Sequence, residues 1–341
     1  MTVDYDLHLP YNMQLKSSLN FCNVLEGIDY DNIDKILYST MNFGKIEPFG
    51  MLLIGAKLRE VKRRHNIKHA YYKISSPHTY AGHMGFFRSI GMPYGKEPGE
   101  APGSRTYVPI SRLSVSKIKR EAKSKGVHIG DIVEGYAEDL AKILYTGDNE
   151  CIGHMTFAIR EIMRNVVEHS TSETIWYAGQ AWHSKDLVEI AILDEGIGIE
   201  QTINSNKYYK KHNFDNLGAL LMALEPGITK TFSPVRSEDD EGGWRNTGFG
   251  LYMTSNICSE IGGFVICSDK HAIWRHGDVE ERIDTSFGGT AIRMRLRLSE
   301  LSKVTKLRSQ LVRTGETQAR KNAKFAVAKA STASKLSLMR K

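Results

Sequence analysis

The chain has 341 residues, of which 41% are hydrophobic and 25% are charged. This is the composition of a globular protein long enough to form two domains. Its most apolar stretch, residues 49–56, is far too short to span a bilayer, which excludes a membrane-spanning function. The opening MTVDYDLHLP is acidic where a secretion signal would be basic. We therefore expect a cytoplasmic protein without membrane contact.

The net charge of +7 belongs to one end of the chain. Residues 303–341 contain eleven Lys or Arg and one acidic residue, Glu316, so the rest of the chain has a net charge of −3. Clustered cations favour nucleic acid or an acidic partner through counterion release. Phe325 is the single aromatic residue of this tail, so base stacking is not expected. A solvated tail without a partner is the alternative.

The four cysteines are Cys22, Cys151, Cys258 and Cys267. None forms a CxxC pair or lies at metal-ligand spacing from histidines, so we expect reduced thiols and no cysteine-bound metal.

Residues 1–92 alternate between strand and helix patterns and predict a small α/β domain. Apolar and aromatic runs predict strands over 35–43 and 68–74. Apolar residues at helical spacing predict helices over 50–64 and 79–90.

Residues 93–106 form the clearest domain boundary, since 93–105 contain three prolines and three glycines. Two helices are predicted next, over 113–125 and 129–144, with Gly126 between them. We interpret residues 107–148 as a helical connector.

Residues 149–300 predict a second domain, and residues 301–341 a basic tail that is helical or disordered. The helix over 156–169 places Glu161 and Asn165 one turn apart on one face. There a carboxylate can activate a water, and an amide oxygen can bind Mg²⁺, which prefers oxygen ligands. A solvated polar pair is the commoner meaning of this spacing.

The next motif follows a strand over 188–193. Asp194 at the strand end is suited to accept a hydrogen bond from the exocyclic amine of adenine. Gly196 and Gly198 allow the backbone to approach a flat base closely. A tight turn in which Asp194 bonds its own backbone is the alternative.

The third motif opens a helix that reaches about residue 261. It spans residues 246–253 and includes Thr247, Gly248, Phe249, Gly250 and Leu251. Glycines that lead into a helix leave N–H groups and the positive end of the helix dipole available to phosphate. A GxG before a helix is weak evidence by itself.

A fourth position, Thr290, begins the last strand and places a hydroxyl where it can reach a base. The ordered series Glu161–Asn165, Asp194, Gly248 and Thr290 resembles the motifs of the GHKL ATPase superfamily (gyrase, Hsp90, histidine kinase, MutL). The resemblance implies an α/β sandwich of helices on a mixed, mostly antiparallel sheet. It also implies that ATP and Mg²⁺ are the cofactors.

The resemblance assigns roles to individual residues. It implies that the nucleotide-binding residues are Asn165, Asp194, Gly196, Gly198, Thr247, Gly248, Phe249, Gly250, Leu251 and Thr290. Asn165 would also be the metal ligand, and Glu161 the general base of any hydrolysis. Residues 200–247 would form a mobile lid that ATP orders.

The N-terminal segment NFGKIEPFGM, residues 42–51, resembles a STAS domain. STAS domains are partners of GHKL kinases in bacterial anti-sigma switches, where a serine before the glycine is phosphorylated. Phe49 occupies that position here and cannot accept phosphate. An unrelated α/β domain is the alternative.

Other nucleotide-binding classes are excluded by their missing motifs, because the sequence has no GxxxxGK[ST] loop and no HRD or DFG kinase set. The histidine between the connector helices, His128, precedes Ile129 and is a poor phosphoacceptor.

We therefore expect a bacterial regulator that binds ATP with Mg²⁺ and switches its contacts with a protein partner or a second subunit. One alternative is a protein serine kinase of the anti-sigma type. Another is a dimerising ATPase clamp that acts near nucleic acid through residues 303–341.

Overall fold

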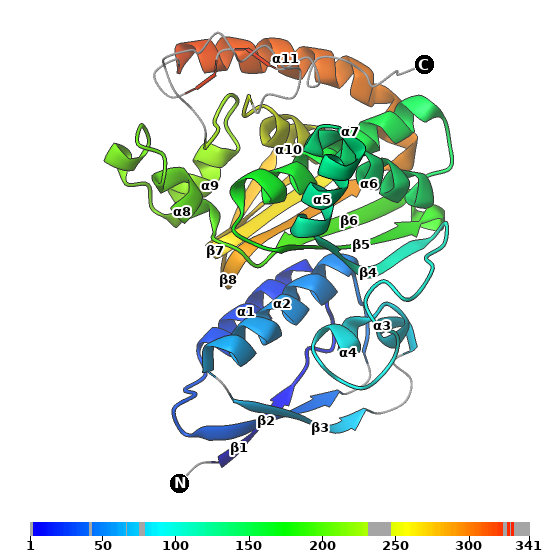
Figure 1. Cartoon of the computed structure of the whole chain (residues 1–341), viewed down its shortest axis with the longest axis vertical. Helices are drawn as coiled ribbons and strands as arrows, with labels where there is room; N and C mark the ends of the chain where they lie inside the picture. Colours follow the sequence, from blue (N-terminus) through cyan, green and yellow to red (C-terminus); the bar gives the residue numbers. More distant parts are fainter. Residues whose placement is uncertain are drawn as a thin grey trace.

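Two β-sheets are separated by a pair of helices, and further helices cover the outer face of the larger sheet (Figure 1). The computed structural model describes residues 3–40, 43–65, 67–74, 79–230, 247–322, 326–327 and 329–330. No described helix is both long and apolar enough to cross a bilayer.

The N-terminal domain has a three-stranded parallel sheet in the order β1-β2-β3. Its strands and connecting helices are β1 (Val3–His8), α1 (Leu15–Glu26), β2 (Ile33–Thr40), α2 (Pro48–His65) and β3 (Lys68–Ile74). Parallel neighbours need a crossover connection, and right-handed crossovers place α1 and α2 on the same face. The predicted α/β domain is present, with α1 as a helix that the sequence analysis missed.

The helix predicted over 79–90 is divided in two, α3 (Thr79–His83) and α4 (Phe86–Ser89). The division lies at Gly85, whose φ of 85° belongs to the left-handed region that glycine adopts without strain. Residues 93–105 contain no helix and no long strand, as their prolines and glycines predict.

The second sheet has five antiparallel strands in the order β4-β5-β6-β8-β7. They are β4 (Tyr107–Ser114), β5 (Thr174–Trp182), β6 (Leu187–Asp194), β7 (Gly262–His276) and β8 (Val279–Leu296). The predicted sandwich of helices on a mostly antiparallel sheet is confirmed. The helices of its outer layer are α5 (Val115–Lys125), α6 (Ile129–Leu144), α7 (Asn149–His169) and α10 (Gly250–Ile261).

Residues 107–148 are not a separate helical connector. Strand β4 pairs with β5 along the edge of the five-stranded sheet, and α6 packs against α7. Pro109 made this strand hard to recognise from the sequence, because proline is rare within strands. An edge strand nevertheless tolerates a proline where its hydrogen-bond ladder is interrupted. The ladder shifts register between Val108 and Ser111, on either side of that proline.

Polar side chains mark the starts of the helices. Asp148 caps α7 by accepting a hydrogen bond from the N–H of Cys151 at 2.9 Å. His128 caps α6, with its Nδ1 3.0 Å from the N–H of Gly130, so this histidine has a local structural role.

The first part of the basic tail is folded. Helix α11 (Val304–Lys321) lies over α7 and α10 (Figure 1). Arg308 is buried, with its guanidinium 4.2 Å from the ring centroid of Phe157. Residues 331–341, which the sequence analysis also assigned to the tail, lie outside the described residues.

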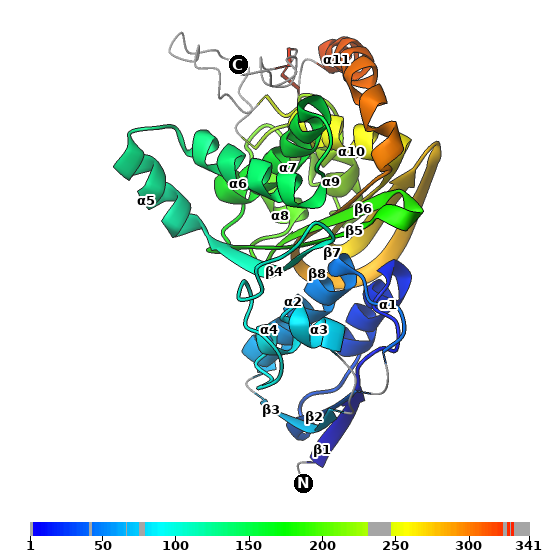
Figure 2. The same cartoon turned by 90° about the vertical axis from the view of Figure 1, so that its right-hand side faces the viewer.

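Helices α1 and α2 cover the face of the five-stranded sheet that faces away from α7, and a turn of 90° shows the same layers (Figures 1 and 2). A single apolar cluster joins residues of these helices to Trp176, Leu193 and Phe287 of the sheet. All four cysteines are buried thiols, as expected, and Cys22 and Cys267 belong to this cluster.

A buried charge cluster lies in the same interface. Glu189 on β6 is fully buried and accepts hydrogen bonds from Nε of Arg293 and Nε of Arg295, each at 2.8 Å. Its other oxygen accepts the N–H of Phe49, in the first turn of α2, at 3.0 Å. Both arginines also pair with Glu47, just before α2. Burial raises the pKa of Glu189, but the two arginines outweigh burial and hold that pKa below its usual value.

We predict that Glu189→Ala lowers the free energy of unfolding by about 3–5 kcal/mol, because the N–H of Phe49 loses its acceptor and the buried Arg293 loses one of its two carboxylate partners. Chemical denaturation measures the change. Glu281→Ala is the matched control, since its ion pair with Lys16 joins the same two domains but is exposed. It is expected to cost less than about 1 kcal/mol. Equal losses in the two variants would contradict the importance of the buried cluster.

Candidate functional site

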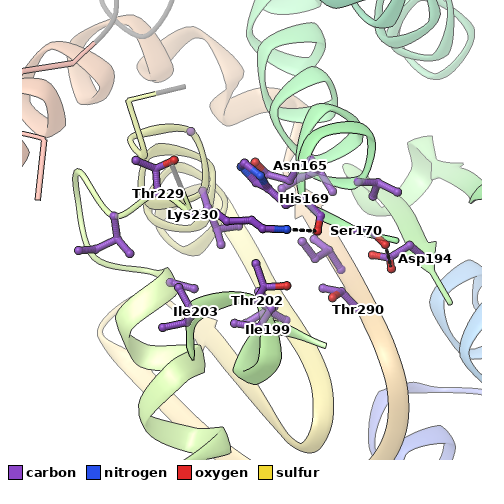
Figure 3. Close-up of a pocket in the computed structure, with 18 of the residues that line it drawn as sticks. Asn165, His169, Ser170, Asp194, Ile199, Thr202, Ile203, Thr229, Lys230 and Thr290 are labelled. Atoms are coloured by element: carbon purple, nitrogen blue, oxygen red, sulfur yellow. Dashed lines mark hydrogen bonds between the residues drawn. The ribbon is translucent and has the colours of Figure 1, made fainter. Parts of the chain in front are cut away.

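A cavity of about 850 Å³, including its open mouth, lies between α7, the five-stranded sheet and the segment that leads from β6 into α8 (Ile199–Asn204) (Figure 3). Its walls are mostly aliphatic, from Ile162 and Val166 of α7, Ile192 and Ile292 of the sheet, and Ile203 of α8. An apolar cleft with a few convergent polar groups is the usual form of a small-molecule site.

Asp194 lies at one end of the cavity, where β6 ends. Its Oδ1 accepts the hydroxyl of Ser170 at 2.6 Å and the N–H of Gly196 at 2.9 Å. Within the described part of the chain, Oδ2 accepts no hydrogen bond, and Asp194 lines the cavity (Figure 3). A carboxylate oxygen is therefore available to a ligand that donates hydrogen bonds.

Burial raises the pKa of Asp194 to about 6, and the bonds from Ser170 and Gly196 oppose that rise. The negative charge of Glu195 adds to it. Asp194 thus ionises just below neutral pH, and its anion is a strong acceptor in a poorly hydrated place.

Thr290 is the register partner of Asp194 across β6 and β8, so both side chains belong to the same end of the cavity. The strands approach closely at Gly289, where an added Cβ would lie 2.3 Å from the carbonyl oxygen of Asp194. A glycine is required there.

The start of α10 lies at another part of the cavity wall, with Gly248 and Gly250. Gly248 has a φ of 73°, and a Cβ added to it would lie 2.2 Å from the carbonyl oxygen of Ile228. Among the described residues, no side chain caps the start of α10. Its first N–H groups and the positive end of its dipole are thus suited to an anion.

Comparison with known families agrees with this arrangement. The family described as histidine kinase-, DNA gyrase B-, and HSP90-like ATPase matches residues 153–300. The match supports a GHKL ATPase domain. It covers fewer than half of the 341 residues and leaves the N-terminal domain unassigned. No curated protein matches the sequence.

The matched segment, residues 153–300, brings together some of the residues predicted from the motifs. Those that line the cavity are Asn165, Asp194, Gly248, Gly250, Leu251 and Thr290. The half-buried side chain of Asn165 projects from α7, and no described residue forms a hydrogen bond with its amide.

Other predicted residues lie beside the cavity without lining it. Phe249 is fully buried, edge-on to Tyr252 in the core. Gly196 and Gly198 form the turn into α8, and Thr247 is buried just before Gly248. These residues shape the backbone around the cavity.

Glu161 lies behind the start of α10. An added Cβ on Gly250 would lie 2.0 Å from its Oε2. Its other oxygen, Oε1, accepts two hydrogen bonds from the buried Arg160, at 3.1 and 2.5 Å. The carboxylate is adjacent to the expected phosphate site but ion-paired, and its role as general base stays a prediction.

The sequence analysis missed several residues of the cavity, including Ser170, Thr202, Thr229 and Lys230 (Figure 3). Nζ of Lys230 donates to the carbonyl oxygen of His169 at 3.4 Å, at the C-terminal end of α7. Burial lowers the pKa of His169, and the charge of Lys230 lowers it further. Ser170 could have been noted as the polar residue directly after the motif helix.

The predicted lid, residues 200–247, is described only in part. Helix α9 (Asn216–Ala223) follows α8, and Asp215 caps it by accepting the N–H of Gly218 at 2.7 Å. Residues 231–246 lie outside the described residues.

We predict that Ser170→Ala raises the pKa of Asp194 above about 6, because the hydroxyl bond that favours the anion is lost. The pKa of Asp194 is measured by NMR from the chemical shift of its carboxyl carbon as a function of pH. Ser172→Ala is the control, since the Ser172 hydroxyl donates to the carbonyl of Thr174. The pKa of Asp194 in the folded chain lies above its value in the unfolded chain, so ionisation of Asp194 lowers the free energy of unfolding. The stability contributed by this group is therefore full below about pH 4 and is lost as pH rises to about 6. An unchanged pKa in Ser170→Ala would show that this bond does not control Asp194.

Proposed function

We propose that the GHKL domain binds ATP with its adenine at Asp194 and its phosphates at the start of α10. The observation that carries the proposal is the buried carboxylate of Asp194, which lines the cavity and whose Oδ2 has no described hydrogen-bond partner. The exocyclic amine of adenine is a donor that matches it. The aliphatic walls from Ile192 and Ile292 suit the faces of a flat base.

The polar groups at the other wall suit the triphosphate. The start of α10 presents N–H groups at Gly250 and Leu251, and Lys230 adds a cation to the cavity. Within the described residues, Lys230 bonds a single carbonyl at 3.4 Å, which leaves its charge available to a phosphate. The domain can thus hold both ends of a nucleotide.

Mg²⁺ fits the donor set at Asn165. Asn165 lines the cavity, and Mg²⁺ bound to a nucleotide needs few protein ligands because waters and phosphate oxygens supply the rest. The described residues contain no group of three or more His, Cys, Asp or Glu able to hold a metal without a nucleotide. When bound, the ion would neutralise phosphate charge, and Asn165 would orient it.

We further propose that ATP orders the lid, residues 200–247, and that the lid changes contacts with a protein partner or a second subunit. Support comes from its flanks, since the N–H of Gly227 donates to the carbonyl of Gly248 at 3.2 Å. This bond holds together the two points between which residues 231–246 extend. The N–H of Val327 donates to the carbonyl of Gly227 at 2.8 Å, so the C-terminal tail contacts one of these two points.

The N-terminal domain is proposed to be a STAS-like input domain of a bacterial regulator. Phe49, which stands where STAS domains carry the phosphorylated serine, is buried against the five-stranded sheet and bonds Glu189 through its N–H. A phosphate acceptor, if the protein is a serine kinase of the anti-sigma type, would therefore belong to a partner. This kinase is our second candidate function.

Calorimetry with ATP and Mg²⁺ tests the binding proposal. We expect Asp194→Asn to weaken binding roughly 10- to 100-fold, because the amide places a donor opposite the adenine amine. We expect Asn165→Ala to remove the dependence of affinity on Mg²⁺. Asp278→Asn, an equal charge change on an exposed turn, serves as the control. Absence of ATP binding by the unmodified chain would contradict the proposed function.

Glu161→Gln separates binding from hydrolysis. If Glu161 is the general base, the variant keeps its ATP affinity and loses phosphate release by roughly 100-fold or more. Labelled phosphate transferred to a partner protein would favour the kinase. Hydrolysis that rises with protein concentration or with DNA would favour the clamp.

A further inference from the structure

The adenine end of the cavity is held from behind by a helix of the other domain. Nε of Arg59, on α2, donates to Oε1 of Glu195 at 2.8 Å. Nη1 of Arg63, one turn later, donates to Oε2 at 3.0 Å. Glu195 directly follows Asp194, so the two arginines hold the residue next to the proposed adenine acceptor.

Arg59 is itself fixed by its surroundings. Its guanidinium lies 4.0 Å from the ring centroid of Trp176 on β5, and its Nη1 donates to the carbonyl of Ser89 at 3.1 Å. The side chains of Arg59 and Glu195 are 17% and 13% exposed, so water screens this pair poorly. Burial lowers the pKa of Arg59, which Glu195 partly restores. Arg59 is therefore held in one position by several contacts, unlike an arginine in an exposed ion pair.

Helix α2 also contacts the second strand of the adenine end. Oε2 of Glu60 accepts the N–H of Gly288 at 3.3 Å, two residues before Thr290. Gly289, between them, packs on the carbonyl of Asp194. One turn of α2 therefore touches both strands that carry the adenine-facing residues.

We propose that Arg59 and Arg63 of the N-terminal domain are positioning residues for adenine recognition in the GHKL domain. Through Glu195 they fix the turn of residues 194–196, so the pocket reaches its full affinity only when α2 is docked on the sheet. This inference rests on the proposed binding of ATP at Asp194. It makes the N-terminal domain part of the nucleotide site, although none of its described residues lines the cavity.

The charges around Asp194 make the pH dependence of ATP binding sensitive to both arginines, which a contact that only packs would not do. Glu195 is the like charge beside Asp194, and Arg59 and Arg63 from α2 compensate it. Towards α7, Asp194 bonds the neutral hydroxyl of Ser170. Two further titratable groups, His169 and Lys230, line the cavity. Loss of either arginine leaves Glu195 less compensated and disfavours the Asp194 anion, whereas loss of the Glu195 charge favours it.

The experiment is ATP affinity of the full chain by calorimetry between pH 5 and 8. The variants are Arg59→Gln, Arg63→Gln and Glu195→Gln. We expect the pH midpoint of binding to rise by about half a pH unit in each arginine variant and to fall by a similar amount in Glu195→Gln. At pH 6, close to the pKa of Asp194, a rise of that size lowers affinity about twofold, and the change approaches threefold at lower pH. The titration of the nucleotide itself is the same for the unmodified chain and every variant, so it cancels when their pH midpoints are compared.

Lys62→Gln is the matched control, because Lys62 is an exposed cation in the same turn of α2 that forms no described bond with Glu195. Arg63 has a side chain 57% exposed, so Arg63→Gln keeps the test valid if Arg59→Gln unfolds the chain. In the Glu195→Gln background, the shift caused by Arg63→Gln should shrink.

Two results would overturn the inference in different ways. If the unmodified chain binds ATP while all variants keep its affinity and midpoint, α2 does not position the adenine turn, and the proposed function stands. If the unmodified chain does not bind ATP, the proposed function fails and the inference fails with it.

Discussion

The five-stranded sheet is apolar on both faces, and the rest of the structure depends on covering both. Strand β6 is buried along almost its whole length, so one layer of helices cannot satisfy it. Helices α7 and α10 cover one face, and α1 and α2 of the N-terminal domain cover the other. Glu189 lies within that second interface and is tolerated because two arginines and a backbone N–H surround it. The N-terminal domain is therefore half of a shared core.

The same strand joins this interface to the proposed nucleotide site. Glu189 near its start bonds the first turn of α2, and Asp194 at its end lines the cavity. Glu195, one residue further, returns to the last turns of α2 through Arg59 and Arg63. Helix α2 thus runs behind the strand and contacts it at both ends. A movement of the N-terminal domain on the sheet would therefore also move the end of the cavity at which Asp194 lies.

The cavity concentrates groups that cost stability in the absence of a ligand. Asp194 has its pKa raised by burial, Asn165 presents an amide without a described partner, and the start of α10 has no side-chain cap from the described residues. A nucleotide with its metal would satisfy each of them. Glu161 differs, because Arg160 already pairs with it. For Glu161 to act as a general base, its ion pair with Arg160 would have to loosen or Oε2 would have to accept the proton alone. Binding of a nucleotide requires neither change.

The sequence by itself determined the features that depend on local spacing. The motif helix, the strand that ends at Asp194, the glycines before α10 and Thr290 could each be recognised because 3.6-residue and two-residue periodicities are local properties. Four residues named from these motifs, Asn165, Asp194, Gly248 and Gly250, line the cavity, and their contacts with a nucleotide stay predictions. Only the tertiary structure decided that β4 joins the sheet, that Arg160 binds Glu161 and that α2 holds Glu195. Those contacts join residues distant in the sequence or depend on which way a side chain packs, and no local pattern encodes either.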